Sequence, residues 1–258
     1  MSKLNKKVAI VTGGNSGIGY STAKRFAEEG AQVILTGRRQ EAVEQAAKEI
    51  GHGAVGIVAD ATKADDTERL LNDVEKQFGK IDVLFLNAGV APMGPFEQFT
   101  EAEYDRVFHT NVKAPFFTIQ KALPKLAEGS SVIINASVAA FKGLPGAAAY
   151  SATKAAVRSL VRTLSTELSE RKIRVNAISP GPIETPLWSK TGLPEDATSE
   201  FGDNIGQVTP LGRFGTADEM AAAVTFLARA RLTSEARGPR AVDPTTWVRP
   251  ADLSEEPS

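Results

Sequence analysis

The chain has 258 residues, 30 of them Lys or Arg and 31 Asp or Glu, so its formal net charge is −1. The length suits one large α/β domain or two small ones, and the charge gives no reason to expect nucleic acid or an anionic membrane as a partner. Cysteine is absent, which excludes disulfides, thiolate metal sites and cysteine nucleophiles and fits a cytoplasmic location. The N-terminus lacks the apolar run of a secretory signal, and no stretch approaches the ~20 apolar residues of a membrane span.

Short runs rich in β-branched side chains alternate with longer amphipathic segments. The runs predict strands at Val8–Thr12, Gln32–Thr36, Ala54–Ala59, Asp82–Leu86, Ser131–Ala136 and Ile173–Ile178. The amphipathic segments predict helices at Ile18–Glu29, Gln40–Ile50, Ala64–Phe78, Glu103–Ala127, Ala152–Glu170 and Glu219–Ala228. In the helix 152–170, one apolar stripe is expected from Ala156, Leu160, Thr163, Leu164 and Leu168. The alternation predicts an α/β fold, a Rossmann-type doubly wound parallel sheet with strand order 3-2-1-4-5-6 and its ligand above the carboxyl ends.

Residues 1–228 are therefore expected to form a single domain. Within it, the region of about 183–213 is rich in Pro, Gly and Thr and is expected to be a long loop with one short helix, placed to bind substrate. The pattern changes at residue 229. The tail 229–258 holds five arginines and four prolines and no strand-like run, which predicts irregular structure.

The segment between the first strand and the first helix reads Thr-Gly-Gly-Asn-Ser-Gly-Ile-Gly, residues 12–19. Glycines in such a turn let a pyrophosphate approach the backbone, and the following helix N-terminus offers free N–H groups. The residues expected to bind a dinucleotide here are Gly13, Asn15, Ser16, Gly17, Ile18 and Gly19. A plain strand–helix turn is the alternative. A nucleotide triphosphatase is disfavoured because the Gly-Lys-Ser/Thr ending is missing.

The second strand leads into Gly37-Arg38-Arg39. A site that prefers NAD usually has a carboxylate here for the ribose 2′-hydroxyl, whereas a guanidinium binds a 2′-phosphate. Arg38 and Arg39 therefore favour NADP(H) over NAD(H). The alternative is that both arginines are simply solvated at the start of a helix.

Further residues lie at the carboxyl ends of the third and fourth strands. Asp60, followed by Ala61, is placed to accept a hydrogen bond from an adenine amino group. Asn87, Ala88 and Gly89 are small or polar and would let a ribose lie close to the backbone. Each group alone is also compatible with a simple turn.

Tyr150 and Lys154 are four residues apart, so a helix would place them on one face. An ammonium beside a phenol favours the phenolate, so we expect the pKa of Tyr150 to be lowered and the phenol to exchange a proton with an alcohol or carbonyl. Ser137 follows the fifth strand and would hold the substrate oxygen. Asn111 lies within the helix expected at 103–127, where it would hold a water or interrupt the helical hydrogen bonds.

With these motifs the chain resembles the classical short-chain dehydrogenase/reductase family over about residues 6–228. The resemblance rests on the glycine turn, Asp60, Asn87-Ala88-Gly89, Asn111, Ser137, Tyr150-Ser151-Ala152-Thr153-Lys154 and Pro180-Gly181. It implies catalytic roles for Tyr150 as acid/base, Lys154 on the tyrosine and the nicotinamide ribose, Ser137 on the substrate oxygen, and Asn111 in a water relay. It also implies that Pro180, Gly181, Ile183 and Thr185 lie by the nicotinamide, with the Ile183 backbone and Thr185 hydroxyl on the carboxamide.

The resemblance further implies a homodimer or homotetramer formed through the helices 103–127 and 152–170. The chain departs from the family after Ala228, where a Val-Thr-Gly segment, a seventh strand and an Asp-Gly-Gly turn usually follow. The seventh strand is therefore in doubt. A frame change in the coding sequence and divergence at a terminus are the two explanations left open.

The function expected is an NADP(H)-dependent oxidoreductase, a carbonyl reductase that transfers hydride between nicotinamide and a small carbonyl or secondary alcohol. The alternatives are an NAD(H)-dependent dehydrogenase of the same family, a non-catalytic dinucleotide-binding sensor and a methyltransferase. The methyltransferase lacks support because its cofactor also prefers a carboxylate after the second strand, and this chain has none there. No metal site is expected, because His52 and His109 have no partners at ligand spacing. For Trp188, pocket lining and local packing are both open.

Overall fold

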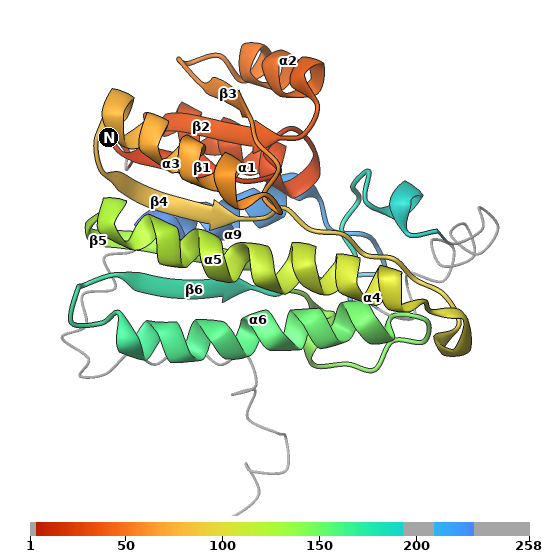
Figure 1. Ribbon diagram of the computed structural model, residues 1–258. Helices are drawn as coiled ribbons and strands as arrows, with labels where there is room; N and C mark the ends of the chain where they lie inside the picture. The colour runs from red at the N-terminus through yellow and green to blue at the C-terminus, as the bar shows by residue number, and fades with distance from the viewer. Residues whose placement is uncertain (1–3, 193–208, 230–258) are drawn as a thin grey trace, which may run out of the picture.

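The computed structural model describes residues 4–192 and 209–229, and this part of the chain forms one parallel sheet covered by helices on both faces (Figure 1). The strands are β1 (Val8–Val11), β2 (Gln32–Gly37), β3 (Val55–Val58), β4 (Ile81–Leu86), β5 (Leu126–Asn135) and β6 (Arg174–Ile178). The helices are α1 (Gly17–Glu28), α2 (Gln40–Ile50), α3 (Ala64–Phe78), α4 (Glu101–Phe108), α5 (Ala114–Ala122), α6 (Ala148–Glu167) and α9 (Ala217–Arg229).

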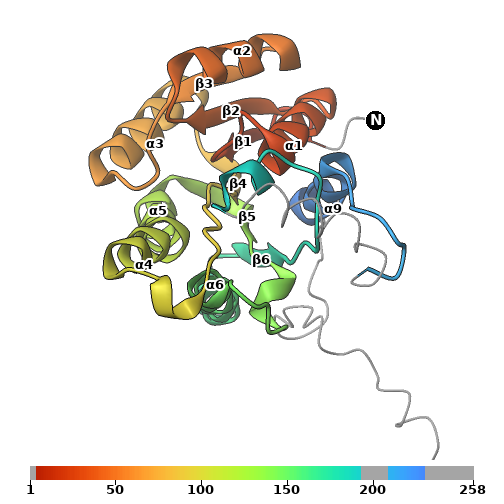
Figure 2. The same ribbon diagram turned by 90° about the vertical axis from the view of Figure 1, so that its right-hand side faces the viewer.

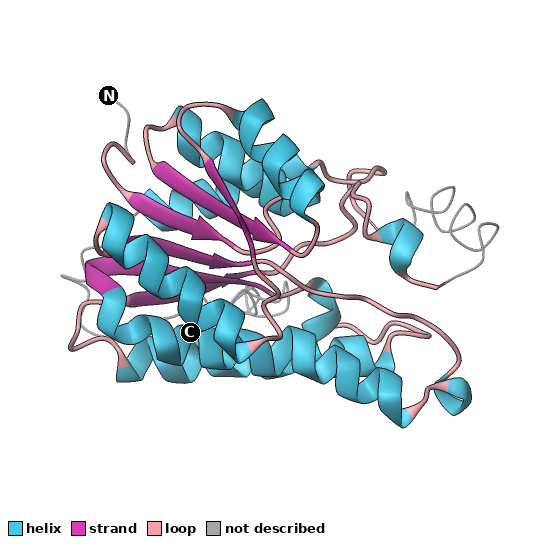
Figure 3. Ribbon diagram, turned by 45° about the horizontal axis from the view of Figure 1, so that its top comes forward, coloured by secondary structure: helices cyan, strands magenta, loops and turns pink. Residues whose placement is uncertain are grey.

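The sheet has the order β3-β2-β1-β4-β5-β6, as predicted, and all neighbouring strands are parallel. Since β2 lies on one side of β1 and β4 on the other, the order reverses at β1. The strand arrows point the same way, so the carboxyl ends of all strands lie at one edge of the sheet (Figure 3). A reversal of this kind leaves a crevice above β1 in which a ligand can lie.

Each face of the sheet has its own hydrophobic core, because successive side chains of a strand point to opposite faces. On β1, Ile10 packs with α3, α5 and α6, while Ala9 and Val11 pack with α1, α2 and α9. The two helix layers are visible on either side of the sheet in Figure 2. The side chains of both clusters are nearly or fully buried, so the sheet is a rigid base for the loops at its carboxyl edge.

The prediction of a single helix at 103–127 is wrong. The structure has α4, then a π-helical turn η2 (His109–Lys113), then α5, which ends at Ala122 and is followed by the 3₁₀ turn η3 (Leu123–Lys125). Pro124 has no N–H and stops the helix, so β5 begins at Leu126, five residues before its predicted start. The π-helical turn centres on Asn111, the residue expected to interrupt the helical bonding.

The helix predicted at 152–170 is α6, which starts four residues earlier, at Ala148. Its buried stripe is not the predicted one: the buried residues are Ala149, Thr153, Lys154, Val157, Val161 and Ser165. Of the predicted stripe only Leu168, just after the helix, is buried, while Leu160 and Leu164 are partly buried against the core. The predicted stripe is thus displaced around the helix from the face that packs on the sheet.

Other predictions fall partly outside the described residues. The loop predicted at 183–213 includes the short helix η5 (Trp188–Lys190), and residues 193–208 of it are not described. The tail was predicted at 229–258; Arg229 is the last residue of α9 and so is helical, and the remainder of that range, with any seventh strand there, lies outside the described part. Among the described helices, none is both long and apolar enough to cross a membrane.

Candidate active site

The turn after β1 has the backbone that a dinucleotide pyrophosphate requires. Gly13 and Gly17 adopt φ of 62° and 53°, which favours glycine. A Cβ on Gly19 would collide with the Gly13 carbonyl oxygen and lie 2.6 Å from the Asn87 amide nitrogen. Ser16, the N-cap of α1, makes no side-chain capping bond, and the first turn of α1 carries no acidic residue. The N-terminus of α1 is thus a cradle with positive partial charge and room for an anion.

Thr12 and Asn87 connect this turn to the end of β4. The Thr12 hydroxyl accepts hydrogen bonds from the main-chain N–H groups of Asn87 (3.0 Å) and Ala88 (3.1 Å). In return the Asn87 side-chain amide donates to the carbonyl oxygens of Thr12 (3.2 Å) and Gly13 (3.1 Å). The two loops expected to hold the cofactor are therefore held together by side-chain bonds.

The end of β2 has no room for a carboxylate at residue 37. A Cβ on Gly37 would lie 2.6 Å from the Asn15 side-chain oxygen and 2.8 Å from a methyl group of Val43. Arg38 and Arg39 follow on the surface, Arg39 as the N-cap of α2, and both side chains are exposed. Neither guanidinium has a hydrogen-bond or ion-pair partner within residues 4–192 and 209–229, so both are available to an anionic group.

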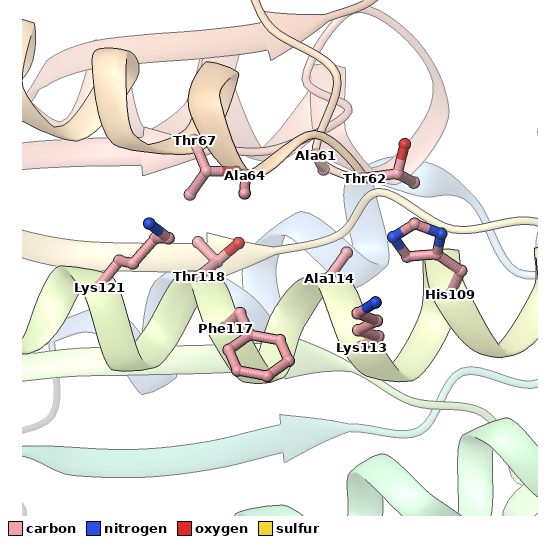
Figure 4. A pocket seen from close by; sticks show the side chains of 10 residues that line it. All are labelled: Ala61, Thr62, Ala64, Thr67, His109, Lys113, Ala114, Phe117, Thr118 and Lys121. Carbon is pink, nitrogen blue, oxygen red and sulfur yellow. The ribbon is translucent and has the colours of Figure 1, made fainter.

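The end of β3 places Asp60 and Ala61 at the same edge. One oxygen of Asp60 accepts bonds from the Thr62 N–H (3.0 Å) and hydroxyl (2.7 Å). Beside it lies a hollow of about 240 Å³ between the start of α3 and the η2–α5 segment (Figure 4). The hollow is lined by Ala61, Thr62, Ala64, Thr67, His109, Lys113, Ala114, Phe117, Thr118 and Lys121. It contains none of the four residues expected to be catalytic.

Asn111 is fixed firmly in the π-helical turn. Its side-chain oxygen accepts from the Val90 N–H (2.9 Å), and its amide donates to the Val90 carbonyl (2.8 Å) and to the Thr153 hydroxyl (3.1 Å). The Thr153 hydroxyl donates in turn to the Tyr150 carbonyl (2.6 Å). This chain ties the loop after β4 to the first turns of α6, where Tyr150 and Lys154 lie.

Lys154, Tyr150 and Ser137 form one cluster. The Lys154 side chain is 7% exposed, and its ammonium donates to the Asn135 main-chain carbonyl at 2.6 Å. The same ammonium lies 5.5 Å from the centre of the Tyr150 ring. The Ser137 hydroxyl, at the end of β5, hydrogen-bonds the Tyr150 phenol and accepts from the Ala139 N–H at 3.1 Å.

The electrostatics of this cluster differ from the expectation. Burial raises the pKa of Tyr150, and the Ser137 hydrogen bond opposes that rise in part. Lys154 is not among the groups that shift the pKa of Tyr150, so burial decides the direction of the shift. Burial also lowers the pKa of Lys154 to about 8. In the free protein at neutral pH the phenol is therefore protonated, and the lysine is still mostly an ammonium.

Gly89 brings the cofactor side and the chemical side together. A Cβ there would lie 3.2 Å from the Asn111 side-chain oxygen and 3.8 Å from the Lys154 ammonium nitrogen. The absence of a side chain thus leaves a space that both polar groups face. There the Lys154 ammonium can donate a hydrogen bond to a ligand hydroxyl, and the Asn111 oxygen can accept one from it.

The segment after β6 closes the site from the other side. Thr185 lies against the glycine turn, since a Cβ on Gly17 would be 3.2 Å from its side chain. The Ile183 carbonyl accepts a hydrogen bond from the Trp188 indole N–H at 2.8 Å. The main-chain N–H of Ile183 is therefore the backbone group of this residue that remains for a ligand. The Trp188 ring meets Phe214 edge-on at 5.7 Å, which is local packing. Pro180 accepts from the Val138 N–H, joining this segment to the loop of Ser137.

The predicted site residues thus lie along the carboxyl edge of the sheet, on loops, in the first two turns of a helix or, for Asn111, in the π-helical turn η2. Three supporting residues were missing from the prediction: Thr12, Thr153 and Asn135. Thr12 and Thr153 belong to the motifs already recognised, so their hydroxyls were open to sequence reasoning. Asn135 carried no sequence signal, because its contacts come from residues on β4 and α6. Among the described residues, no group of three or more His, Asp or Glu side chains has a metal-binding arrangement.

Comparison with known proteins agrees with this geometry. A family described as enoyl-(acyl carrier protein) reductase matches residues 13–234. An oxidoreductase of Sarocladium schorii is 38% identical over 230 residues, which are 88% of this chain and 90% of the relative. A hydroxynaphthalene reductase-like protein of Metarhizium majus is 36% identical over 235 residues, 86% of this chain and 88% of the relative.

Among solved structures, a 3-ketoacyl-(acyl-carrier-protein) reductase from Brucella melitensis in complex with NADH superposes with a TM-score of 0.79. It is 34% identical, and the match covers 87% of this chain and 91% of that one. The matches span nearly the whole described part of the chain, including the glycine turn and the Tyr150 cluster. The chain is an oxidoreductase that belongs to the short-chain dehydrogenase/reductase family.

Proposed function

We propose that the protein is an NADP(H)-dependent carbonyl reductase in which Tyr150 transfers the proton. The observation that carries the proposal is the cluster of Asn111, Ser137, Tyr150 and Lys154 beside a glycine turn that is built to hold a pyrophosphate. A sensor that only binds a dinucleotide has no need for a buried phenol and ammonium beside a serine hydroxyl.

The proposed chemistry assigns one role to each side chain. A bound nicotinamide supplies or accepts the hydride. Ser137 donates a hydrogen bond to the substrate carbonyl oxygen, and Tyr150 gives that oxygen its proton. Since burial raises the pKa of Tyr150, the phenol carries its proton at neutral pH and can donate it to the substrate oxygen. Lys154 stabilises the phenolate that remains, and Asn111 positions a water that returns the proton from solvent.

The preference for NADP(H) rests on the end of β2. A 2′-phosphate would meet Arg38 and Arg39, both exposed and both without a partner in the described part of the chain. The NADH complex of the Brucella reductase makes NAD(H) the second candidate. The ratio of kcat/KM with NADPH to that with NADH separates the two, and Arg38→Asp should lower this ratio by at least about tenfold if the guanidinium binds a phosphate.

The substrate class is a small or medium carbonyl compound with an apolar body. The relatives bear the names of a hydroxynaphthalene reductase-like protein and a 3-ketoacyl reductase, which suggests aromatic and 3-oxoacyl ketones as the first compounds to test. A panel of such ketones, aldehydes and sugars would be screened for NADPH oxidation. Loss of all turnover in Tyr150→Phe, with NADPH still bound, supports the proposal. Full turnover in that variant would refute it.

The remaining proposals concern the assembly. We propose that residues 1–228 act as one NAD(P)-binding catalytic domain in the cytoplasm and form a homodimer or homotetramer through α4–α5 and α6. Tyr104, Phe116 and Phe117 on α4 and α5 expose 47%, 43% and 43% of their surfaces, which supports contact with a second copy. Light scattering of the wild type and of Phe117→Glu gives the test: the molar mass should fall in the variant.

A further inference from the structure

Asn135, the last residue of β5, links the catalytic lysine to the cofactor side of the site. Its main-chain carbonyl accepts the Lys154 ammonium at 2.6 Å. Its side-chain amide donates to the Asn87 side-chain oxygen at 2.9 Å, and the Asn87 amide donates to the carbonyls of Thr12 and Gly13. An unbroken path of hydrogen bonds thus runs from Lys154 across β5 and β4 to the glycine turn.

The direction of every bond in this path is fixed. The carbonyls of Thr12 and Gly13 can only accept, so the Asn87 nitrogen must face them and the Asn87 oxygen must face Asn135. That oxygen can only accept, so the Asn135 nitrogen must face it. As a consequence the Asn135 side-chain oxygen is buried and has no hydrogen-bond partner in the structure. An unpaired buried acceptor costs free energy, so the hydrogen bond to Asn87 must hold the Asn135 side chain in this orientation.

Lys154 depends on this residue more than on any other. Within residues 4–192 and 209–229, the Asn135 carbonyl is the hydrogen-bond acceptor found for its ammonium. The elements packed against α6 are the 3₁₀ turn η4 (Val138–Ala140), β6, η2 and α4. They bring no carboxylate to the lysine, since burial alone accounts for its pKa of about 8, and Tyr150 on α6 is the titratable group beside it. The ammonium is therefore stabilised by a peptide dipole whose position matters.

We propose that Asn135 is a positioning residue for the catalytic lysine. Its side-chain amide fastens the end of β5 to Asn87, and this fixes the main-chain carbonyl that holds the Lys154 ammonium beside Tyr150 and Gly89. The catalytic consequence rests on the proposed function, whereas the placement of the ammonium does not. Asn135→Ala removes the side-chain bond but keeps the main-chain carbonyl, so it tests the placement directly.

The first readout is the titration of Lys154 in the cofactor-free protein. NMR of the protein labelled with ¹³C-lysine measures this titration. The Lys154 signal is identified as the one that is missing from the spectrum of Lys154→Met. A carbonyl oxygen that is held less firmly stabilises the ammonium form less, so the pKa of Lys154 should fall in Asn135→Ala. The ammonium-to-amine ratio at pH 8 should then be at least about threefold lower than in the wild type. Asn135→Thr, which suits a strand and also lacks the amide, should do the same and covers the case that the alanine variant folds poorly.

The second readout separates binding from turnover. The kcat should fall about tenfold because the ammonium is misplaced. The Kd for NADPH should rise by less than about fivefold, because only the Lys154 contact to the ribose is weakened while Asn87 keeps its bonds to Thr12 and Gly13. Asn176→Ala, on β6 away from the site, is the matched control and should leave the Lys154 titration and kcat unchanged.

An unchanged Lys154 titration in both Asn135 variants would overturn the proposal, even if the melting temperature fell, because a purely structural asparagine would lower stability alone. The proposed function fails separately, through full turnover in Tyr150→Phe. A shifted Lys154 titration together with an active Tyr150→Phe would therefore support the role of Asn135 while refuting the assignment of Tyr150.

Discussion

Replacing Lys154 by methionine should change how the stability of the protein depends on pH. Lys154 is 7% exposed, and burial lowers its pKa from 10.5 to about 8 in the folded protein. Below pH 8 both the folded and the unfolded chain carry the ammonium, so the folded state bears the full cost of holding the charge in the site. As the pH rises from 8 to 10.5, the folded protein loses this proton first and the cost disappears.

The size of the effect follows from the shift. A difference of roughly 2.5 units corresponds to about 3 kcal/mol, because one unit is about 1.4 kcal/mol. The free energy of unfolding of the wild type, minus that of Lys154→Met, should therefore increase by about 3 kcal/mol between pH 7 and 10.5, with most of the increase reached at pH 10. Methionine fits because it has a similar length and no charge.

The assay is urea unfolding of the cofactor-free protein at pH 7, 8, 9 and 10, followed by circular dichroism at one protein concentration. Other groups titrate in both proteins, so their contributions cancel in the difference. Lys113→Met, which removes an exposed ammonium on η2, controls for the loss of one charge. Parallel curves for the wild type and Lys154→Met would refute the reasoning, since they would mean that the ammonium is not desolvated on folding.

Three further substitutions test the frame of the site. Gly19→Ala should abolish NADPH binding or cost at least about 2 kcal/mol of stability, because its Cβ would collide with the Gly13 carbonyl; calorimetry and urea unfolding measure the two effects, and wild-type values for both would contradict the close approach. Thr12→Val should destabilise by about 2 kcal/mol, because two main-chain N–H groups lose their acceptor, whereas a loss under 0.5 kcal/mol would show that water replaces it. Arg174→Met should lower the melting temperature, because its guanidinium caps the last carbonyls of α9; an unchanged melting curve would mean that α9 ends equally well without it.

Much of the site was open to prediction from the chain alone because its residues follow strands directly. Gly13, Asp60, Asn87 and Ser137 each stand at or just after the end of a predicted strand. Parallel strands bring their carboxyl ends to one edge, so these residues had to meet once the strand order was known. Tyr150 and Lys154 needed only helical periodicity to share a face.

Interactions between elements distant in sequence were not open to prediction. The bonds of Asn135 to Asn87 and to Lys154 span 48 and 19 residues, and no local pattern marks them. The raised pKa of Tyr150 follows from how deeply its phenol is buried, with the Ser137 hydrogen bond opposing the rise, and the spacing of residues along a helix gives neither. The π-helical turn at Asn111 likewise follows from its three hydrogen bonds to Val90 and Thr153.

The sequence by itself determined which chemical groups stand at the carboxyl edge, because the hydrophobic period and the turn residues are local properties that fix where each strand ends. The tertiary structure decided which partner each group has and how strongly it is desolvated. The physical reason is that hydrogen bonds and burial depend on distances of a few ångströms between segments that are far apart along the chain.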